Sequence, residues 1–488
     1  MPGPHSSKRQ ADTVAPSGSR PRAGGSWTPA QAERHLQTLE LFGMRFGLDR
    51  MRRMMTALGS PERRLETIHV LGTNGKTSTT RMTAAILERH GLRTGVYTSP
   101  HLVSYSERVR IAERDLREGE FAAALARAAR AAERVNRTLA EDDHVTQFEL
   151  ITAAALSEMA EREVQAAVVE AGLGGRYDAT SVIDAPVTVL TNVGLEHTRW
   201  LGPTVRDIAE EKLAVVRSGG TLVLGSWLAA DALAVAERVA GERKARIVRA
   251  EEVPDTVSLA ARGPFQRRNF ALARAAAEVH LRGAGIETDE RAVLAAGATT
   301  DVPGRLQVVD ERPLTVLDGA HNPDAIVELA RSLPEVVGAR ELGLVMGVLE
   351  DKDAARMLAA LLPLCARAWF TAPPSSRALS PAALQSLARQ LGFEEVRCEP
   401  QPQRALQAAR SWACENGEDD ENGEDAGRGK HGVNGDGDGE VQSTGNGKRG
   451  KGRAVLVTGS IYLVGDLLCG LRASDTLDAR ASPRTRAI

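Results

Sequence analysis

A short glycine-rich run with one lysine is the part of the sequence best suited to chemistry. Residues 72–77 read Gly-Thr-Asn-Gly-Lys-Thr, between an apolar run at 67–71 and a stretch at 78–90 that is expected to be helical. Glycines let the backbone curl so that its N–H groups face an anion, and a helix N-terminus adds partial positive charge. The lysine would reach the β- and γ-phosphates of a nucleotide, with the next hydroxyl near Mg²⁺. We therefore expect nucleotide contacts from Gly72, Thr73, Asn74, Gly75, Lys76 and Thr77.

This run is shorter than the full phosphate-loop pattern G-x-x-x-x-G-K-[ST]. The full pattern requires glycine at position 70, which is Val70. The alternative interpretation is a glycine-rich turn in which the lysine is incidental. A strand before the run and a helix after it favour the phosphate loop.

Two polar side chains follow apolar strands further along. Glu170 ends the run Ala-Ala-Val-Val-Glu, and His197 follows the apolar run at 187–191. Ligands of open α/β sheets bind beyond the carboxyl ends of the strands, where a carboxylate is a suitable Mg²⁺ ligand. The alternatives are a solvated glutamate at a strand end and a structural histidine.

Lys212 stands out because it lies on an apolar helix face. The stretch 204–217 carries Val205, Ile208, Ala209 and Val216 on one stripe, with Thr204 and Asp207 as an N-terminal capping box. Lys212 is four residues from Ile208 and from Val216, so it falls on that stripe. A buried ammonium is costly unless it is paired or chemically changed. The alternative is a lysine that snorkels to the helix edge.

A second polar cluster lies near the start of the C-terminal part. Asp318 ends an apolar run at 314–317, and His321, Asn322 and Pro323 lead into the next helix. These side chains could bind a ribose, a phosphate or a substrate carboxylate, and Arg305 beside a tight turn suits phosphate. The alternative is an ordinary capped helix start.

The elements that must position these residues alternate between short β-branched runs and Ala-rich stretches. Strands are expected at 67–71, 166–169, 187–191, 221–224, 314–317, 342–346 and 454–457, and helices at 78–90, 121–138, 148–161, 204–217, 268–282 and 353–362. Alternation of this kind predicts an α/β protein with parallel sheets covered on both faces.

The chain divides into two expected domains and three polar segments. We place a disordered tail at 1–26, a first domain at 27–300, a second at 301–472 and a flexible tail at 473–488. A low-complexity insertion at 415–453 has hardly any apolar side chain to offset its ordering entropy. The short ordered stretch after it must complete the second domain.

Composition and charge indicate which kinds of partner and compartment to expect for this protein. The 62 Lys and Arg nearly balance 64 Asp and Glu, which gives a net charge of −2 and no bulk attraction for nucleic acid or anionic membrane. The four cysteines have no metal spacing, and neither a membrane span nor a secretory signal is evident. We expect a cytoplasmic protein with small-molecule partners.

These motifs, in this order, resemble the Mur ligase superfamily and, within it, the folylpolyglutamate synthase/dihydrofolate synthase family. The matching runs lie at 72–77, 97–102, 106–108, 170–180, 194–198, 211–212, 303–305, 318–323 and 458–465. The run Glu-Ala-Gly-Leu-Gly-Gly-Arg-Tyr-Asp-Ala-Thr at 170–180 and the run Thr-Ser-Pro-His-Leu at 98–102 are specific to this family. The match departs where Lys76 is followed directly by Thr77, since the family usually has Gly-Lys-Gly.

The resemblance implies a P-loop NTPase-like domain, the central domain of Mur ligases, followed by a Rossmann-like C-terminal domain, with the active site between them. It assigns phosphate binding to Lys76, a carbamylated side chain to Lys212, and a place near an acyl phosphate to His321. It further implies nucleotide contacts from Gln266, Asn269, Arg305 and Asp318, and Mg²⁺ ligands from Glu170, His197 and either Thr98 or Ser99.

The implied reaction uses ATP and Mg²⁺ to add L-glutamate to dihydropteroate or a reduced folate in a monomeric ligase. The carboxylate of the pterin substrate becomes an acyl phosphate, which the glutamate amine then attacks. Two other functions stay open: a Mur-type ligase acting on a non-folate carboxylate, and a P-loop protein that binds or hydrolyses nucleotide as a switch.

Overall fold

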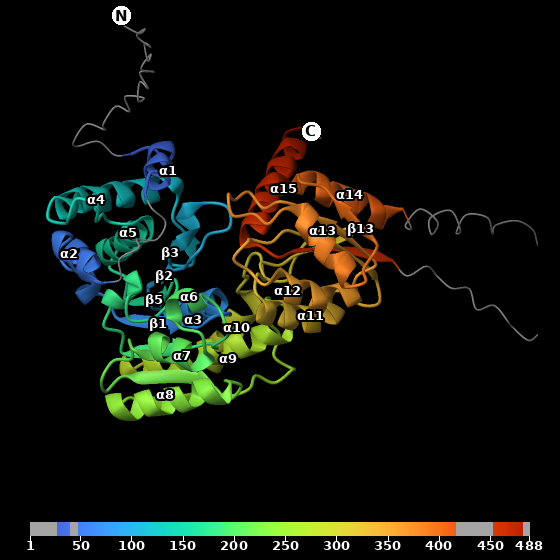
Figure 1. Ribbon diagram of the computed structural model, residues 1–488. Helices are drawn as coiled ribbons and strands as arrows, with labels where there is room; N and C mark the ends of the chain where they lie inside the picture. The colour runs from blue at the N-terminus through green and yellow to red at the C-terminus, as the bar shows by residue number, and fades with distance from the viewer. Residues whose placement is uncertain (1–26, 40–46, 416–451, 482–488) are drawn as a thin grey trace, which may run out of the picture.

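The computed structural model describes residues 27–39, 47–415 and 452–481 (Figure 1). The predicted tail at 1–26 and nearly all of the predicted insertion at 415–453 lie outside these residues. The last described helix runs to Ala481, so helical backbone continues past residue 472, where the sequence predicted a flexible tail.

The N-terminal domain is built on an eight-stranded sheet with the order β4-β3-β2-β5-β1-β6-β7-β8. The strands are β1 (Thr67–Leu71), β2 (Thr94–Tyr97), β3 (Val109–Ile111), β4 (Arg114–Asp115), β5 (Ala166–Glu170), β6 (Val187–Leu190), β7 (Thr221–Gly225) and β8 (Arg246–Ala250). Strands β1 and β5 lie in the centre and are fully buried, which explains their unbroken apolar sequences.

Helices cover both faces of this sheet. One face packs on α3 (Lys76–Arg89), α9 (Pro264–Gly283) and α10 (Glu290–Thr299). The other face packs on α1 (Pro29–Gln37), α2 (Asp49–Ala57), α4 (Glu118–Asn136) and α5 (Gln147–Glu161) over one half, and on α7 (Val205–Leu213) and α8 (Ala230–Arg243) over the other. A single turn of helix, α6 (Thr198–Leu201), precedes α7. Short 3₁₀ turns lie at Pro61–Arg64, Tyr105–Arg108 and Ala179–Val182.

The C-terminal domain has a six-stranded sheet with the order β13-β12-β11-β14-β10-β9. Its strands are β9 (Gln307–Glu311), β10 (Leu314–Leu317), β11 (Glu341–Met346), β12 (Arg367–Phe370), β13 (Val396–Cys398) and β14 (Arg453–Thr458). Helices α11 (Pro323–Val337), α12 (Ala354–Leu361) and α13 (Pro381–Gln390) cover one face, and a 3₁₀ turn at Leu362–Leu364 follows α12. Helices α14 (Pro402–Cys414) and α15 (Ile461–Ala481) cover the other face.

Every strand and helix expected from the sequence is present, with ends shifted by a few residues. The helix expected at 204–217 ends at Leu213, and its capping box of Thr204 and Asp207 is confirmed. The predicted strands pair with one another in parallel, as expected. Antiparallel pairing joins β2 to β3, β3 to β4 and β9 to β10, and each of these pairs includes a strand that the sequence did not predict.

The last strand, β14, lies between β10 and β11, so the stretch after residue 453 completes the C-terminal sheet as expected. The strand begins at Arg453, the residue at which the insertion was expected to end. Within the described ranges, no helix has the length and apolar character needed to cross a membrane. All four cysteines are free thiols.

Candidate active site

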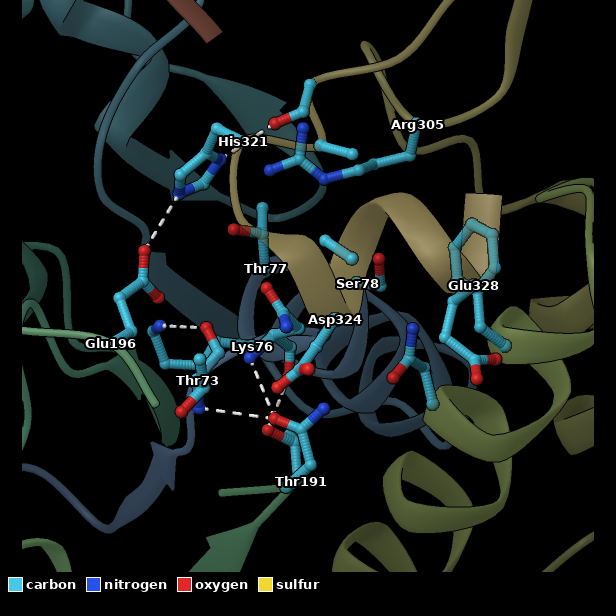
Figure 2. Close-up of a pocket in the computed structure, with 18 of the residues that line it drawn as sticks. Thr73, Lys76, Thr77, Ser78, Thr191, Glu196, Arg305, His321, Asp324 and Glu328 are labelled. Atoms are coloured by element: carbon cyan, nitrogen blue, oxygen red, sulfur yellow. Dashed lines mark hydrogen bonds and ion pairs between the residues drawn. The ribbon is translucent and has the colours of Figure 1, made fainter. Parts of the chain in front are cut away.

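A cavity of about 490 Å³ lies where the two domains meet, and both contribute side chains to it (Figure 2). The N-terminal domain provides residues that follow β1, β2, β5 and β6 together with the start of α9. The C-terminal domain provides the turn before β9 and the segment from the end of β10 into α11. Among the residues that line it are Thr73, Asn74, Gly75, Lys76, Thr77, Ser99, Glu170, His197, Asn269, Arg305, Asp318 and His321.

The phosphate loop joins β1 to α3 and depends on two glycines. Gly72 and Gly75 have φ of +143° and +83°, where side chains are disfavoured. A Cβ on Gly72 would lie 1.9 Å from Thr191 Oγ1, and a Cβ on Gly75 would lie 2.3 Å from Asn269 Oδ1. Gly75 precedes α3 and provides no side-chain cap, so the first N–H groups of the helix are open to an anion.

Two amides of the loop donate to Asn192 within the N-terminal domain. The N–H of Asn74 donates to Asn192 Oδ1 over 2.8 Å, and the N–H of Thr73 donates to the Asn192 carbonyl over 3.1 Å. The Lys76 ammonium donates to the carbonyls of Gly72 and Thr73, at 3.1 and 3.0 Å. The Lys76 side chain therefore folds back over the loop, and Lys76 lines the cavity.

Glu170 ends the central strand β5, and its carboxylate faces the phosphate loop. The Thr77 hydroxyl donates to its two oxygens over 3.0 and 2.9 Å, and the backbone N–H of Ser99 approaches to 3.3 Å. The side chain is only 2% exposed. Burial raises the pKa of Glu170 to about 7, against the nearby charge of Lys76. A buried carboxylate beside two hydroxyl-bearing residues and the phosphate site is a suitable ligand for a hard cation.

Of the other predicted metal ligands, His197 and Ser99 line the cavity and Thr98 does not. His197 lines the cavity with φ of +54° and keeps an exposed surface. Desolvation by the surrounding protein atoms lowers its pKa, which favours the neutral imidazole that metal binding requires. Ser99 lines the cavity, whereas Thr98 is buried and does not. No group of three or more His, Cys, Asp or Glu in the described ranges could hold a metal ion. A cation here would therefore need hydroxyl and phosphate oxygens besides Glu170 and His197.

Lys212 lies behind the phosphate loop and is not among the residues that line the cavity. Its side chain is 2% exposed, and Ile208 and Val216 on the same stripe are equally buried, so the predicted burial is confirmed. The amine donates to the carbonyls of Gly72, at 3.1 Å, and Leu173, at 2.7 Å. Burial, together with the charge of Lys76, lowers the pKa of Lys212 to about 7. The lysine thereby ties α7 to the phosphate loop.

On the C-terminal side, Asp318 and Arg305 meet at one turn. The Asp318 carboxylate accepts from the N–H groups of Leu306 and Ala320, each at 2.8 Å. Burial raises its pKa, against the charge of Arg305. The Arg305 guanidinium donates to the Gly304 carbonyl over 2.9 Å and points into the cavity opposite Thr77 (Figure 2). Asp318 thus shapes the turn that presents Arg305.

The His321 imidazole lies between two acceptors. Its Nδ1 is 2.8 Å from the Gly319 carbonyl, and its Nε2 is 3.3 Å from Glu196 Oε1. The imidazole therefore bridges the turn at Gly319 and Glu196 of the N-terminal domain. Of the predicted nucleotide contacts on α9, Asn269 lines the cavity, whereas Gln266 is fully buried behind it and accepts from Asn269 over 2.8 Å.

Sequence reasoning missed Glu196 and Lys352 at this interface, and it expected Asn322 to bind a ligand rather than the phosphate loop. Glu196 belongs to the run at 194–198, yet no role was expected of it; contacts with His321 and Lys352 hold its pKa well below its usual range although burial opposes this. Asn322 shares a reciprocal pair of amide hydrogen bonds with Asn74, at 3.0 and 3.3 Å. Lys352 lies in an Asp-Lys-Asp turn, and the sequence of this turn does not indicate a contact with Glu196.

Comparisons with known proteins agree with this geometry. Residues 70–225 match the model of the Mur ligase middle domain, and residues 304–419 match that of the Mur ligase, glutamate ligase domain. The chain is 33% identical to the folylpolyglutamate synthase of Lacticaseibacillus casei, over 69% of this chain and 84% of that protein. It is also 33% identical to the dihydrofolate synthase/folylpolyglutamate synthase of Escherichia coli, over 71% and 81%.

Solved structures give the same result. The Mycobacterium tuberculosis folylpolyglutamate synthase complexed with ADP and AMPPCP aligns with a TM-score of 0.78 and 28% identity, over 91% of this chain and 98% of that chain. Escherichia coli FolC in complex with DHPP and ADP aligns with a TM-score of 0.74 and 28% identity, over 94% and 99%. This chain belongs to the folylpolyglutamate synthase/dihydrofolate synthase family of Mur ligases.

Proposed function

We propose that this enzyme uses ATP to join L-glutamate to the carboxylate of dihydropteroate, of a reduced folate, or of both. The observation that carries the proposal is one cavity with a phosphate loop and a buried carboxylate on one wall, and Arg305, Asp318 and His321 on the other. A P-loop protein that only switched between nucleotide states would not need this second set of polar groups. Relatives named for both synthase activities support the substrate class.

The chemistry follows in two steps. The substrate carboxylate attacks the γ-phosphate of ATP, and the Oβγ–Pγ bond breaks to give an acyl phosphate and ADP. The amine of glutamate then attacks the acyl carbon, loses a proton, and expels inorganic phosphate. Lys76 offsets negative charge on the β- and γ-phosphates from one wall, and Arg305 and His321 do so from the other.

Glu170, His197, Thr77 and Ser99 are the residues that would hold Mg²⁺, with the phosphates completing its oxygen ligands. When bound, this cation neutralises charge on the transferring phosphate. A Mycobacterium tuberculosis relative complexed with ADP and AMPPCP, and a Yersinia pestis relative complexed with AMPPNP and Mn ion, support a nucleotide and a divalent metal as ligands.

Carbamylation of Lys212 is proposed as well. The lowered pKa of Lys212 leaves a large fraction of neutral amine near pH 7, which is the form that reacts with CO₂. Intact-protein mass spectrometry in bicarbonate should find one added CO₂ that is absent in Lys212→Ala. A mass without that addition, together with full activity of Lys212→Ala, would remove the proposed role.

The deciding experiment assays purified enzyme with ATP and glutamate against dihydropteroate and tetrahydrofolate separately. We expect phosphate release that depends on both glutamate and a pterin carboxylate, with a ligated product of matching amount. Phosphate release independent of either substrate would instead favour a nucleotide switch. Activity only with a nucleotide-sugar peptide would favour a Mur-type ligase of another pathway.

We also propose a monomer working in the cytoplasm. Four free thiols support a reducing compartment. Light scattering coupled to gel filtration tests the first point, and fractionation of cells tests the second.

A further inference from the structure

One cluster of charges crosses between the domains, and two of its members, Glu196 and Lys352, have no part in the chemistry above. Glu196 lies on the loop between β6 and α6 of the N-terminal domain. Its Oε1 accepts from Lys352 Nζ over 3.2 Å, and His321 Nε2 is 3.3 Å away (Figure 2 shows the His321 contact). Both partners belong to the C-terminal domain. The side chains of Glu196 and Lys352 are only 9% and 12% exposed.

The turn that carries Lys352 is fixed within its own domain. The N–H of Lys352 donates to the Leu349 carbonyl over 3.1 Å, and the N–H of Glu350 donates to the Arg377 carbonyl over 2.8 Å. Asp353 then caps α12 by accepting from the N–H of Arg356. These hydrogen bonds fix the turn to the rest of the C-terminal domain. The Lys352 ammonium therefore moves together with that domain.

Glu196 is fixed to the phosphate loop in turn. Its N–H donates to the Gly194 carbonyl over 3.0 Å, and the N–H of Gly194 donates to Thr73 Oγ1, also over 3.0 Å. Nearby, the amides of Asn74 and Asn322 join the loop to the start of α11. The contact between Glu196 and Lys352 thus links the C-terminal domain to the loop that is expected to hold the phosphates.

We propose that Lys352 is a positioning residue that, through Glu196, holds the C-terminal domain closed over the phosphate loop and keeps water away from the acyl phosphate. This role rests on the proposed function, because the acyl phosphate exists only in a ligase. If water attacks that intermediate, its carboxylate and inorganic phosphate are released, and ATP is consumed without ligated product.

Loss of the Lys352 charge affects the closed and the open forms of the protein differently. In the closed protein without Lys352, the Glu196 charge stays buried and loses a partner, which disfavours closure. When the domains part, water solvates Glu196 and removes that penalty. Removal of the lysine charge therefore shifts the molecule toward an open form, in which the intermediate meets water.

The test compares Lys352→Met, which keeps the length but removes the charge, with Lys352→Arg, which keeps the charge. Asp351→Asn is the matched control, because Asp351 also pairs with Lys352, at 3.3 Å, but lies in the same turn and is 45% exposed. The readout is the ratio of phosphate released to product ligated. We expect this ratio to rise about tenfold or more in Lys352→Met and to stay near wild type in the other two variants.

Other outcomes separate this role from its competitors. An unchanged ratio with a raised KM for glutamate would mean that Lys352 binds substrate, and the proposal would be wrong. Equal loss of both rates with an unchanged ratio would also contradict it. If the wild-type enzyme makes no product at all, the proposed function fails. Small-angle scattering without substrates then tests the contact between Glu196 and Lys352 by itself. A larger radius of gyration in Lys352→Met than in wild type supports closure by Lys352, and an unchanged radius refutes it.

Discussion

At the scale of single residues, Lys76 is the side chain on which turnover should depend most. Its ammonium lies over the phosphate loop and is the cation nearest to the expected phosphates. Lys76→Ala should lower kcat by roughly 100-fold or more, because it removes charge stabilisation that the transition state needs. Lys244→Ala, at an exposed lysine that ends α8, is the control. Near-normal rates for Lys76→Ala in a folded protein would refute the loop assignment.

Lys212 gives a prediction for stability against pH. Its pKa is lowered to about 7 in the folded protein, from an ordinary value of 10.5. Between these values the unfolded chain binds the proton and the folded protein does not, so the free energy of unfolding rises with pH in this window. The cost of the buried charge is present in full below pH 7.

Lys212→Met removes this group, so its advantage over wild type should shrink by about 2 kcal/mol between pH 7 and 9. Urea unfolding of both proteins in CO₂-free buffer measures the difference, in which all other titrating groups cancel. A difference that stays constant over this range would mean that Lys212 keeps its proton in the folded protein.

Sequence alone identified most of the cavity at this scale, because strand-end positions and glycine spacing are local signals. It placed Lys76, Glu170, His197, Arg305 and His321 in one site, and the structure brings them around one cavity. Glu196 and Lys352 were not predicted because they are 156 positions apart along the chain and come together only in the folded protein. The local sequence around either residue gives no sign of a contact between the domains.

At the scale of elements, the start of α11 serves two purposes. Asn322 Oδ1 accepts from the N–H of Ala325 over 2.9 Å and caps the helix, while its amide pairs with Asn74 in the other domain. Ser380 caps α13 in the same way, and both helices have proline at the first turn. Asn322, which lies at the site, and Ser380, which lies away from it, can therefore be compared as N-caps of similar helices.

Asn322→Ala and Ser380→Ala should each cost about 1 kcal/mol of stability through the lost cap. Only Asn322→Ala should also raise the KM for ATP, because it releases the phosphate loop from the C-terminal domain. Thermal melts and initial rates measure the two effects. Equal KM values in both variants would show that the amide pair does not influence nucleotide binding.

The strands and helices that sequence predicted are the buried central ones. Strands such as β1 and β5 are apolar throughout because both of their faces are covered. The strands that were missed are short or carry charged residues, and they are β2, β3, β4, β8, β9, β12 and β13. Antiparallel pairing of β9 with β10 follows from the two-residue turn between them, which periodicity does not report.

At the scale of the whole molecule, described residues on either side of the stretch 416–451 lie close together. The Arg453 guanidinium donates to the Trp412 carbonyl over 2.7 Å, and the N–H of Glu341 donates to the Gly452 carbonyl over 3.0 Å. Replacing 416–451 by a short Gly-Ser linker should therefore leave kcat and KM unchanged. Stability should rise by about 1 kcal/mol, because a shorter loop costs less entropy to close. Loss of activity in a folded deletion variant would assign the stretch a function.

The position of β14 has a consequence for synthesis of the chain. This strand follows all the other strands of its sheet along the chain, yet it lies in the middle of that sheet, between β10 and β11. A nascent chain in which β14 has not yet left the ribosome has β10 and β11 without the strand that joins them. The N-terminal domain can fold while translation continues, whereas the wall of the active site that carries Arg305 and Asp318 must await the emergence of β14. A premature stop before Arg453 should thus yield a folded nucleotide domain attached to an unfolded, protease-sensitive remainder.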